Sequence, residues 1–108
     1  MDDLMIKRGD VYYANLDPVK GHETGKTRPV VVIQNDIGNM YSPTTIVAIV
    51  TEYSETKASY PICVTVKKGK GLKKKSIVNL SLIRTIDKQR LKAPKISELS
   101  DNVMKKVD

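Results

Sequence analysis

The sequence contains neither tryptophan nor phenylalanine, and five tyrosines are its only aromatic residues. Leucine, isoleucine and valine must therefore build the hydrophobic core. There is no run of about 18 apolar residues, so we expect no membrane-spanning helix. The acidic start of the chain lacks the basic and apolar regions of a signal peptide, and the single cysteine, Cys63, cannot form an internal disulfide. These absences predict a protein of the reducing cytoplasm.

The same scarcity excludes several familiar sites. One histidine, His22, and one cysteine cannot supply the ligands of a typical zinc site within a single chain. The sequence has no Walker motif, no GxGxxG after a strand and no GxSxG. The aspartates do not cluster in a magnesium-binding pattern. We therefore expect neither a metal ion nor a cofactor.

Positive charge, by contrast, is abundant. Nineteen lysines and arginines against twelve acidic residues give a net charge of +7 and a pI near 9.5. This balance favours a polyanionic partner, either a nucleic acid or an acidic protein. Six lysines crowd the glycine-bearing stretch 67–75. They indicate either a surface that holds a nucleic-acid backbone or a hairpin tip kept in solution by its charge, and the sequence leaves both readings open.

Short β-branched or alternating segments, separated by turn residues, run through most of the chain and predict strands. The polar stretch 52–59 is expected to be a loop, and the turn-forming stretch 35–43 to contain one helical turn. Residues 62–80 are interpreted as a hairpin with the lysine-rich segment at its tip. The expected strands cover 10–16, 29–34, 44–51, 62–66 and 76–80, with a last strand and turn over 82–91.

The C-terminal residues have a different period. Leu99, Val103 and Val107 recur every four residues behind Ser97 or Ser100, which predicts a short amphipathic helix with a serine N-cap. Because no interior segment offers a crossover helix, a parallel α/β sheet is disfavoured. The pattern favours a mainly β fold, a small curved antiparallel barrel with a short C-terminal helix, formed by one domain over residues 1–108.

The stretch 18–35 organises the chain. Its second half is an unbroken β-branched run, typical of a strand buried on both faces, and its first half is a polar, glycine-bearing loop. Arg28 stands at the junction, where Pro29 biases it towards an extended conformation. Thr51 ends the next expected strand. If the two strands are antiparallel neighbours, Arg28 and Thr51 lie at one edge of the sheet and could share a phosphate. The alternatives are an ordinary surface arginine and an ordinary strand threonine.

Several segments resemble the MazF/PemK family of toxin endoribonucleases. The matching segments include RGDVY at 8–12, RPVVVIQND at 28–36 and IRTIDKQRL at 83–91, with shorter matches such as SPT at 42–44 and SIV at 76–78 between them in order, and the most specific are the blocks RPVVV and RTIDK. The resemblance implies an SH3-like curved barrel of the MazF/CcdB-like toxin type and a homodimer. It also implies metal-independent, sequence-specific cleavage of single-stranded RNA, and neutralisation by an acidic, MazE-like antitoxin.

The resemblance also assigns residues. The family's catalytic arginine and threonine fall on Arg28 and Thr51, and its loop glutamate falls on Glu23. Arg28 is expected to donate charge-assisted hydrogen bonds to phosphoryl oxygens as negative charge develops there, and Thr51 to position the phosphate or relay a proton. The general base stays open between Glu23 and His22. The residues expected to bind RNA are Lys26, Lys57, Lys68, Lys70, Lys73 and Arg84.

Two departures and two other functions accompany this resemblance. Relatives commonly carry glutamine where this chain has Leu82, so its RNA recognition sequence should not be copied from theirs. Relatives also continue the last helix beyond the position of Asp108. A barrel of this kind could instead bind a protein target such as a topoisomerase, or act as an RNA-binding regulator that leaves RNA intact.

Overall fold

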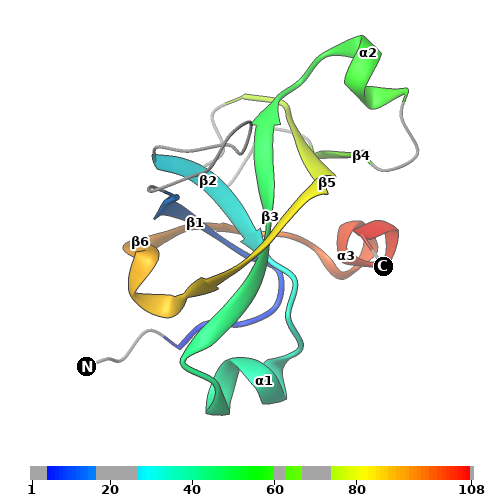
Figure 1. Ribbon diagram of the computed structural model, residues 1–108. Coiled ribbons are helices and arrows are strands. Elements are labelled where there is room, and N and C mark those ends of the chain that lie inside the picture. The colour runs from blue at the N-terminus through cyan, green and yellow to red at the C-terminus, as the bar shows by residue number, and fades with distance from the viewer. Residues whose placement is uncertain (1–4, 17–26, 60–62, 67–73, 108) are drawn as a thin grey trace.

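Six strands form one antiparallel sheet in the computed structural model of this chain (Figure 1). The structure describes residues 5–16, 27–59, 63–66 and 74–107, without the side chains of Lys57 and Ala58. The strands are β1 (Asp10–Asn15), β2 (Thr27–Val32), β3 (Thr44–Glu52), β4 (Cys63–Val66), β5 (Ser76–Asp87) and β6 (Leu91–Glu98). The helical elements are α1 (Asp36–Tyr41), α2 (Glu55–Ala58), the 3-10 turn η1 (Lys88–Arg90) and α3 (Asp101–Val107).

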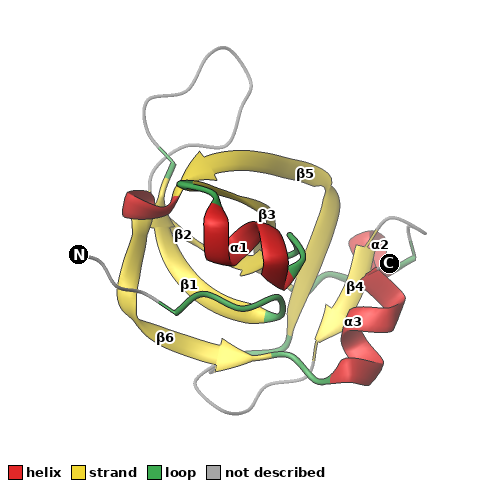
Figure 2. Ribbon diagram, turned by 90° about the horizontal axis from the view of Figure 1, so that it is seen from below, coloured by secondary structure: helices red, strands yellow, loops and turns green. Residues whose placement is uncertain are grey.

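The strand order is β4-β5-β3-β2-β1-β6, and every pair of neighbours is antiparallel. The sheet curls strongly on itself, with α1 across one end of the curve (Figure 2). β4 and β6 stand at the two ends of the hydrogen-bonded order, so the pairing does not close into a continuous ring. The prediction of a mainly β, curved antiparallel fold with a short C-terminal helix is confirmed.

The central strands are buried on both faces, as the β-branched run predicted. On one face, Val30 and Val32 of β2 belong to a hydrophobic cluster that also holds Val47 and Ile49 of β3. On the other face, Val31 belongs to a second cluster. We call these the first and the second cluster. The second cluster also contains Val64 and Val66 of β4 and Met104 and Val107 of α3, so α3 covers this side of the sheet.

The short helices begin where local side chains satisfy free backbone donors. The side chain of Asn35 accepts from the backbone N–H of Gly38 at 2.8 Å and caps α1, which confirms the helical turn expected within 35–43. The side chain of Ser100 accepts from Val103 N at 3.2 Å at the start of α3, so Ser100 rather than Ser97 is the N-cap. The predicted amphipathic C-terminal helix is confirmed.

Residues 76–87 form one strand, which corrects the expectation of two separate strands on either side of Ser81. β5 pairs with β3 along its whole length, but Ile49 lies opposite Asn79 whereas the adjacent Ala48 lies opposite Ile83. Residues 80–82 thus form a bulge. The side chain of Asn79 accepts from both the N–H and the hydroxyl of Ser81, at 3.0 and 2.6 Å, and satisfies these donors locally.

The strand and turn expected over 82–91 are present as the second part of β5 and η1, but that strand is not the last, because β6 follows and was not predicted. Its sequence is polar and contains Pro94, which cannot donate to a ladder. β6 is nevertheless paired with β1 at both of its ends, and the register shifts between Val11 and Tyr13, opposite the proline. An edge position and an irregularity are the places where a strand tolerates proline.

A second correction concerns the stretch 52–59, which was expected to be a loop. It contains α2, one helical turn.

Candidate functional site

Arg28 lies in β2, near the strand's first residue, and its side chain is exposed. Its backbone pairs with Ala14 of β1, and Thr27 pairs with Asn15. The side of Arg28 that faces β1 is therefore held by the ladder. The recorded pairing with β3 includes only residues 30–32, so it stops two residues short of Arg28.

Thr51 is the last but one residue of β3 and lies opposite Ile77 of β5. Its Oγ1 is covered from solvent and has no hydrogen-bond partner. Among the residues that the structure describes, it is the only buried side-chain polar atom in this condition. A buried hydroxyl without a partner typically costs about 1–3 kcal/mol, so its presence needs an explanation other than stability.

The register between β2 and β3 directs these two residues to the same edge of the sheet. Val30 lies opposite Ile49, and Arg28 and Thr51 each lie two residues beyond this last pair, where the antiparallel register, if continued, would set them opposite each other. Residues opposite each other share a face of the sheet, and Val30 and Ile49 both belong to the first cluster. The expectation that the two strands are antiparallel neighbours is confirmed. The catalytic roles of Arg28 and Thr51 stay predictions.

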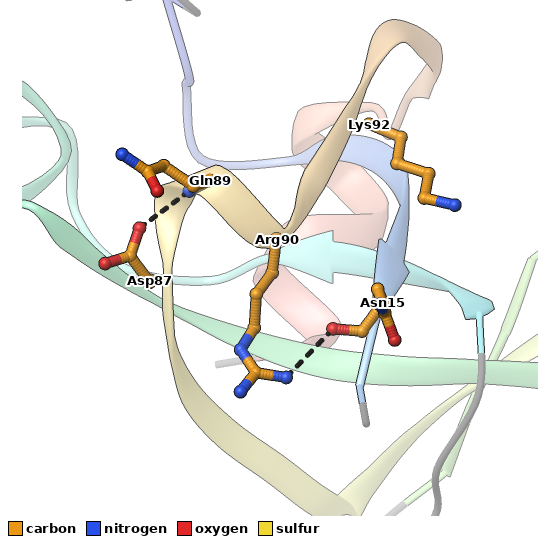
Figure 3. Close-up of a pocket in the computed structure, with 5 residues that line it drawn as sticks. All are labelled: Asn15, Asp87, Gln89, Arg90 and Lys92. Atoms are coloured by element: carbon orange, nitrogen blue, oxygen red, sulfur yellow. Dashed lines mark hydrogen bonds between the residues drawn. The ribbon is translucent and has the colours of Figure 1, made fainter. Parts of the chain in front are cut away.

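Arg84, expected to bind RNA, makes a contact within the protein. It lies in β5 opposite Val47, and its Nη1 donates to the carbonyl oxygen of Leu16 at 3.0 Å. Arg90, which was not predicted as a site residue, donates in the same way to the carbonyl oxygen of Asn15 at 3.1 Å (Figure 3). The partners are 68 and 75 residues apart in the chain and accept through backbone atoms, so no sequence motif could have indicated either bond.

A polar pocket of about 430 Å³ lies beside the contact of Arg90 with Asn15 (Figure 3). Part of its lining belongs to η1, whose N-cap Asp87 accepts from Gln89 N at 2.8 Å. Because Asn15 pairs with Thr27, the pocket begins one strand away from Arg28. No sequence motif indicated this pocket, since its lining joins one residue of β1 to the segment 87–92, more than 70 residues further along the chain. The lining residues are Asn15, Asp87, Gln89, Arg90 and Lys92.

Two described lysines of the basic stretch lie near the end of β3. Lys74 forms an exposed ion pair with Glu52 at 3.6 Å. Lys75 places its Nζ 4.0 Å from the centre of the Tyr53 ring. Exposed ion pairs contribute little to stability, so these contacts leave the lysine charges available to an anion. The described surface beyond Thr51 therefore carries two lysines together with the acidic Glu52.

Other predicted site residues cannot be placed. His22, Glu23, Lys26, Lys68, Lys70 and Lys73 lie outside the described residues, and Lys57 lies in α2 without a described side chain. In the part of the chain that is described, no three metal-ligating side chains gather. Over the same part, no helix is long and apolar enough to cross a membrane.

Known proteins resemble this chain along almost its full length. Residues 7–108 match the family described as PemK-like, MazF-like toxin of type II toxin–antitoxin system. Endoribonuclease EndoA of Bacillus subtilis (strain 168) is 53% identical over 106 residues, which cover 97% of this chain and 90% of that protein. The structure of MazF from Deinococcus radiodurans has a TM-score of 0.81 at 25% identity, covering 97% of this chain and 91% of the other. A mycobacterial endoribonuclease in complex with its cognate antitoxin has a TM-score of 0.75 at 20% identity, covering 94% and 86%.

Proposed function

This chain belongs to the family of PemK-like, MazF-like toxins of type II toxin–antitoxin systems and is an endoribonuclease, and we propose that it cleaves single-stranded RNA through Arg28 and Thr51 without a metal ion. The single observation that supports the proposal is the antiparallel register of β2 and β3, which, continued two residues past Val30 and Ile49, leads to Arg28 and Thr51. The unpartnered Thr51 Oγ1 supports it, because a substrate phosphate that displaces the atoms covering this oxygen would supply the missing hydrogen-bond partner.

The proposed reaction is an internal transesterification. The ribose 2′-oxygen loses its proton and forms a bond to the adjacent phosphorus, while the bond from phosphorus to the 5′-oxygen breaks. The departing oxygen takes up a proton, so the products are a 2′,3′-cyclic phosphate and a 5′-hydroxyl. Negative charge develops on the phosphoryl oxygens, where the Arg28 guanidinium donates two charge-assisted hydrogen bonds.

Thr51 has a different role in this proposal. Its hydroxyl has too high a pKa to act as an efficient base near neutral pH, so it positions the phosphate or relays a proton to the departing oxygen. Glu23 and His22 are the candidate general bases, and we expect His22 to be dispensable. The His22→Ala variant should therefore lose less than about a hundredfold in rate, whereas Glu23→Gln should lose more than that if Glu23 is the base.

The remaining partners follow from charge and from the relatives. We propose that the lysines at positions 26, 57, 68, 70 and 73 hold the RNA backbone, because the chain carries a net charge of +7. We also propose a homodimer and an acidic, MazE-like antitoxin as its protein partners, since a similar fold is known in complex with an antitoxin. The single thiol, Cys63, is compatible with a cytoplasmic site of action.

One experiment tests the reaction and separates it from its competitors. The purified protein is incubated with mixed single-stranded RNA in EDTA, and the new RNA ends are mapped by their ability to accept a 5′-phosphate. Cleavage that survives EDTA, leaves 5′-hydroxyl ends and falls with Arg28→Ala supports the proposal. The matched control is Lys105→Ala, which removes an exposed positive charge from α3.

Each other outcome contradicts the proposal. Cleavage that stops in EDTA would indicate a metal ion. RNA that is bound and left intact would favour an RNA-binding regulator. Neither binding nor cleavage would favour a barrel that acts on a protein target such as a topoisomerase. Full activity in both Arg28→Ala and Thr51→Val would place the reaction elsewhere on the molecule.

A further inference from the structure

Arg84 connects two strands that are not neighbours in the sheet. It lies in β5, whereas the carbonyl that accepts from its Nη1 belongs to Leu16, directly after β1, and β3 and β2 stand between these strands. Leu82 and Ile86 alternate with Arg84 along β5, and both pack with the first cluster. The arginine therefore projects from the same face and crosses the inside of the curved sheet to reach the end of β1.

Arg90 holds the neighbouring carbonyl from another direction. It ends η1, immediately before Leu91, which pairs with Ala14 at the start of β6. Its Nη1 donates to the carbonyl of Asn15, as Figure 3 shows. Two consecutive carbonyls at the end of β1 thus each accept a hydrogen bond from a different arginine.

The end of β1 is also the segment that pairs with the start of β2, where Arg28 lies. Ala14 pairs with Arg28, and Asn15 pairs with Thr27. The side chains of Ala14 and Leu16 are fully buried in the first cluster, so this end of β1 is held by packing as well as by the two arginines. Arg28 has no recorded pairing on the β3 side, so β1 is the strand that fixes its backbone.

We propose that Arg84 and Arg90 are positioning residues, which hold the carbonyls of Leu16 and Asn15 and thereby fix the end of β1 that places Arg28 for the reaction. This inference rests on the proposed function of Arg28. It gives Arg84 a role different from the expected contact with RNA. The planar guanidinium suits the role, because it offers several donors in fixed directions and keeps its charge at all relevant pH values.

Positioning and RNA binding predict different kinetics. A misplacement of about 1 Å in a catalytic group can cost roughly a hundredfold in rate, so loss of a positioning residue lowers kcat and leaves KM nearly unchanged. Loss of an RNA-phosphate contact instead raises KM and reduces the slope of log affinity against log salt by about one. The two roles can therefore be separated in one set of measurements.

The experiment compares Arg84→Gln, Arg90→Gln and Arg84→Lys with the parent protein, at several salt concentrations in EDTA. We expect both glutamine variants to lose about ten- to a hundredfold in kcat, with KM and the salt slope unchanged. The lysine variant should recover part of the loss, because it restores one charged donor. The control is Lys92→Gln, which removes a charge from the same pocket and should leave kcat unchanged.

Two further readouts keep the proposal falsifiable if activity is lost through unfolding. Hydrogen exchange at the amides of β1 and β2 should be faster in Arg84→Gln, while the amides of α3 keep their protection. In the Arg28→Ala background, Arg84→Gln should cause little further loss, since both act through one group.

Three results would overturn the inference: a raised KM with a reduced salt slope, unchanged kinetics in both glutamine variants, or fully additive losses with Arg28→Ala. A parent rate that does not depend on Arg28 would instead contradict the proposed function, so the two failures are distinguishable.

Discussion

Arg28 and Thr51 lie on neighbouring antiparallel strands, each two residues beyond the last paired residues, Val30 and Ile49. Arg28 is exposed, whereas the Thr51 oxygen is covered and has no partner among the described residues. The guanidinium is therefore accessible to an anion from solvent, whereas the hydroxyl is a covered group whose hydrogen-bonding capacity is unused. This difference leads to distinct expectations for the two residues.

Replacing Arg28 by lysine tests whether the geometry of the guanidinium matters beyond its charge. Lysine keeps the positive charge but cannot donate two parallel hydrogen bonds to one phosphate. We expect the single-turnover cleavage rate to fall about tenfold or more, but by less than the roughly hundred- to thousandfold loss typical of removing such a donor. A lysine variant with the parent rate would show that charge alone is sufficient.

Replacing Thr51 by valine should separate activity from stability. The substitution removes the unpartnered hydroxyl and keeps the branched shape, so we expect the free energy of unfolding to rise by about 1 kcal/mol. The cleavage rate should fall strongly, while Thr51→Ser, which keeps a hydroxyl, should retain more of it. Urea denaturation and initial rates measure the two effects. A Thr51→Val protein that is less stable than its parent would contradict the first expectation.

Leu82 is the expected determinant of an RNA preference that differs from that of relatives. It is partly buried and packs against the first cluster. Its apolar side chain has no group that could form a hydrogen bond with a base edge. We expect Leu82→Gln to change the sequence at which RNA is cut without abolishing cleavage. Sequencing of the cleaved ends from a random RNA pool measures the change. An identical cleavage sequence in parent and variant would remove Leu82 from base recognition.

The N-cap of α3 should contribute measurably to stability, because α3 covers the second cluster through Met104 and Val107. Ser100→Ala removes the acceptor for Val103 N and should lower the free energy of unfolding by about 1 kcal/mol. Asn102→Ala, an exposed change in the first turn of the same helix, is the control and should not destabilise the protein. Equal stability of the two variants would contradict the capping role.

Tyr12 should make stability depend on pH in alkaline solution. Burial, followed by the negative charge of Asp10, raises the pKa of Tyr12 above its ordinary value of 10.0. An unfolded chain then loses the phenolic proton at lower pH than the folded one, so this contribution is complete below pH 10 and is lost as the pH rises towards the folded-state pKa. The free energy of unfolding should therefore fall more steeply above pH 10 in the parent than in Tyr12→Phe. Parallel pH profiles would contradict this expectation.

Much of the fold could be predicted because its signals are local. β-branched runs indicated β2 and β3, and the repeat of Leu99, Val103 and Val107 indicated α3. β5 was read as two strands because its alternation is reset within the bulge. Leu80 packs with the second cluster and Leu82 with the first, although two residues apart they would ordinarily share a face. A pattern that changes face cannot be told from two strands by sequence alone.

Some features of the candidate site could likewise be predicted from the sequence, and others could not. The placement of Arg28 and Thr51 towards the same edge of the sheet could be predicted, because adjacent antiparallel strands fix which ends coincide. The contacts of Arg84 and Arg90 could not, because their acceptors are backbone carbonyls, which every residue possesses. The pocket beside Arg90 depends on β6, and that strand was missed because Pro94 and polar residues give it no strand pattern.

The open ends of the hydrogen-bonded order have a consequence for behaviour at high concentration. An unpaired strand edge is a template on which another chain can add a strand and begin to aggregate. Here the described part of β4 spans four residues, Cys63–Val66, and β6 carries Pro94 together with the exposed charges of Lys92 and Lys95. Both edges are therefore poor templates for β-strand addition. At high concentration the protein should resist fibril formation, even though its sheet is not closed by hydrogen bonds.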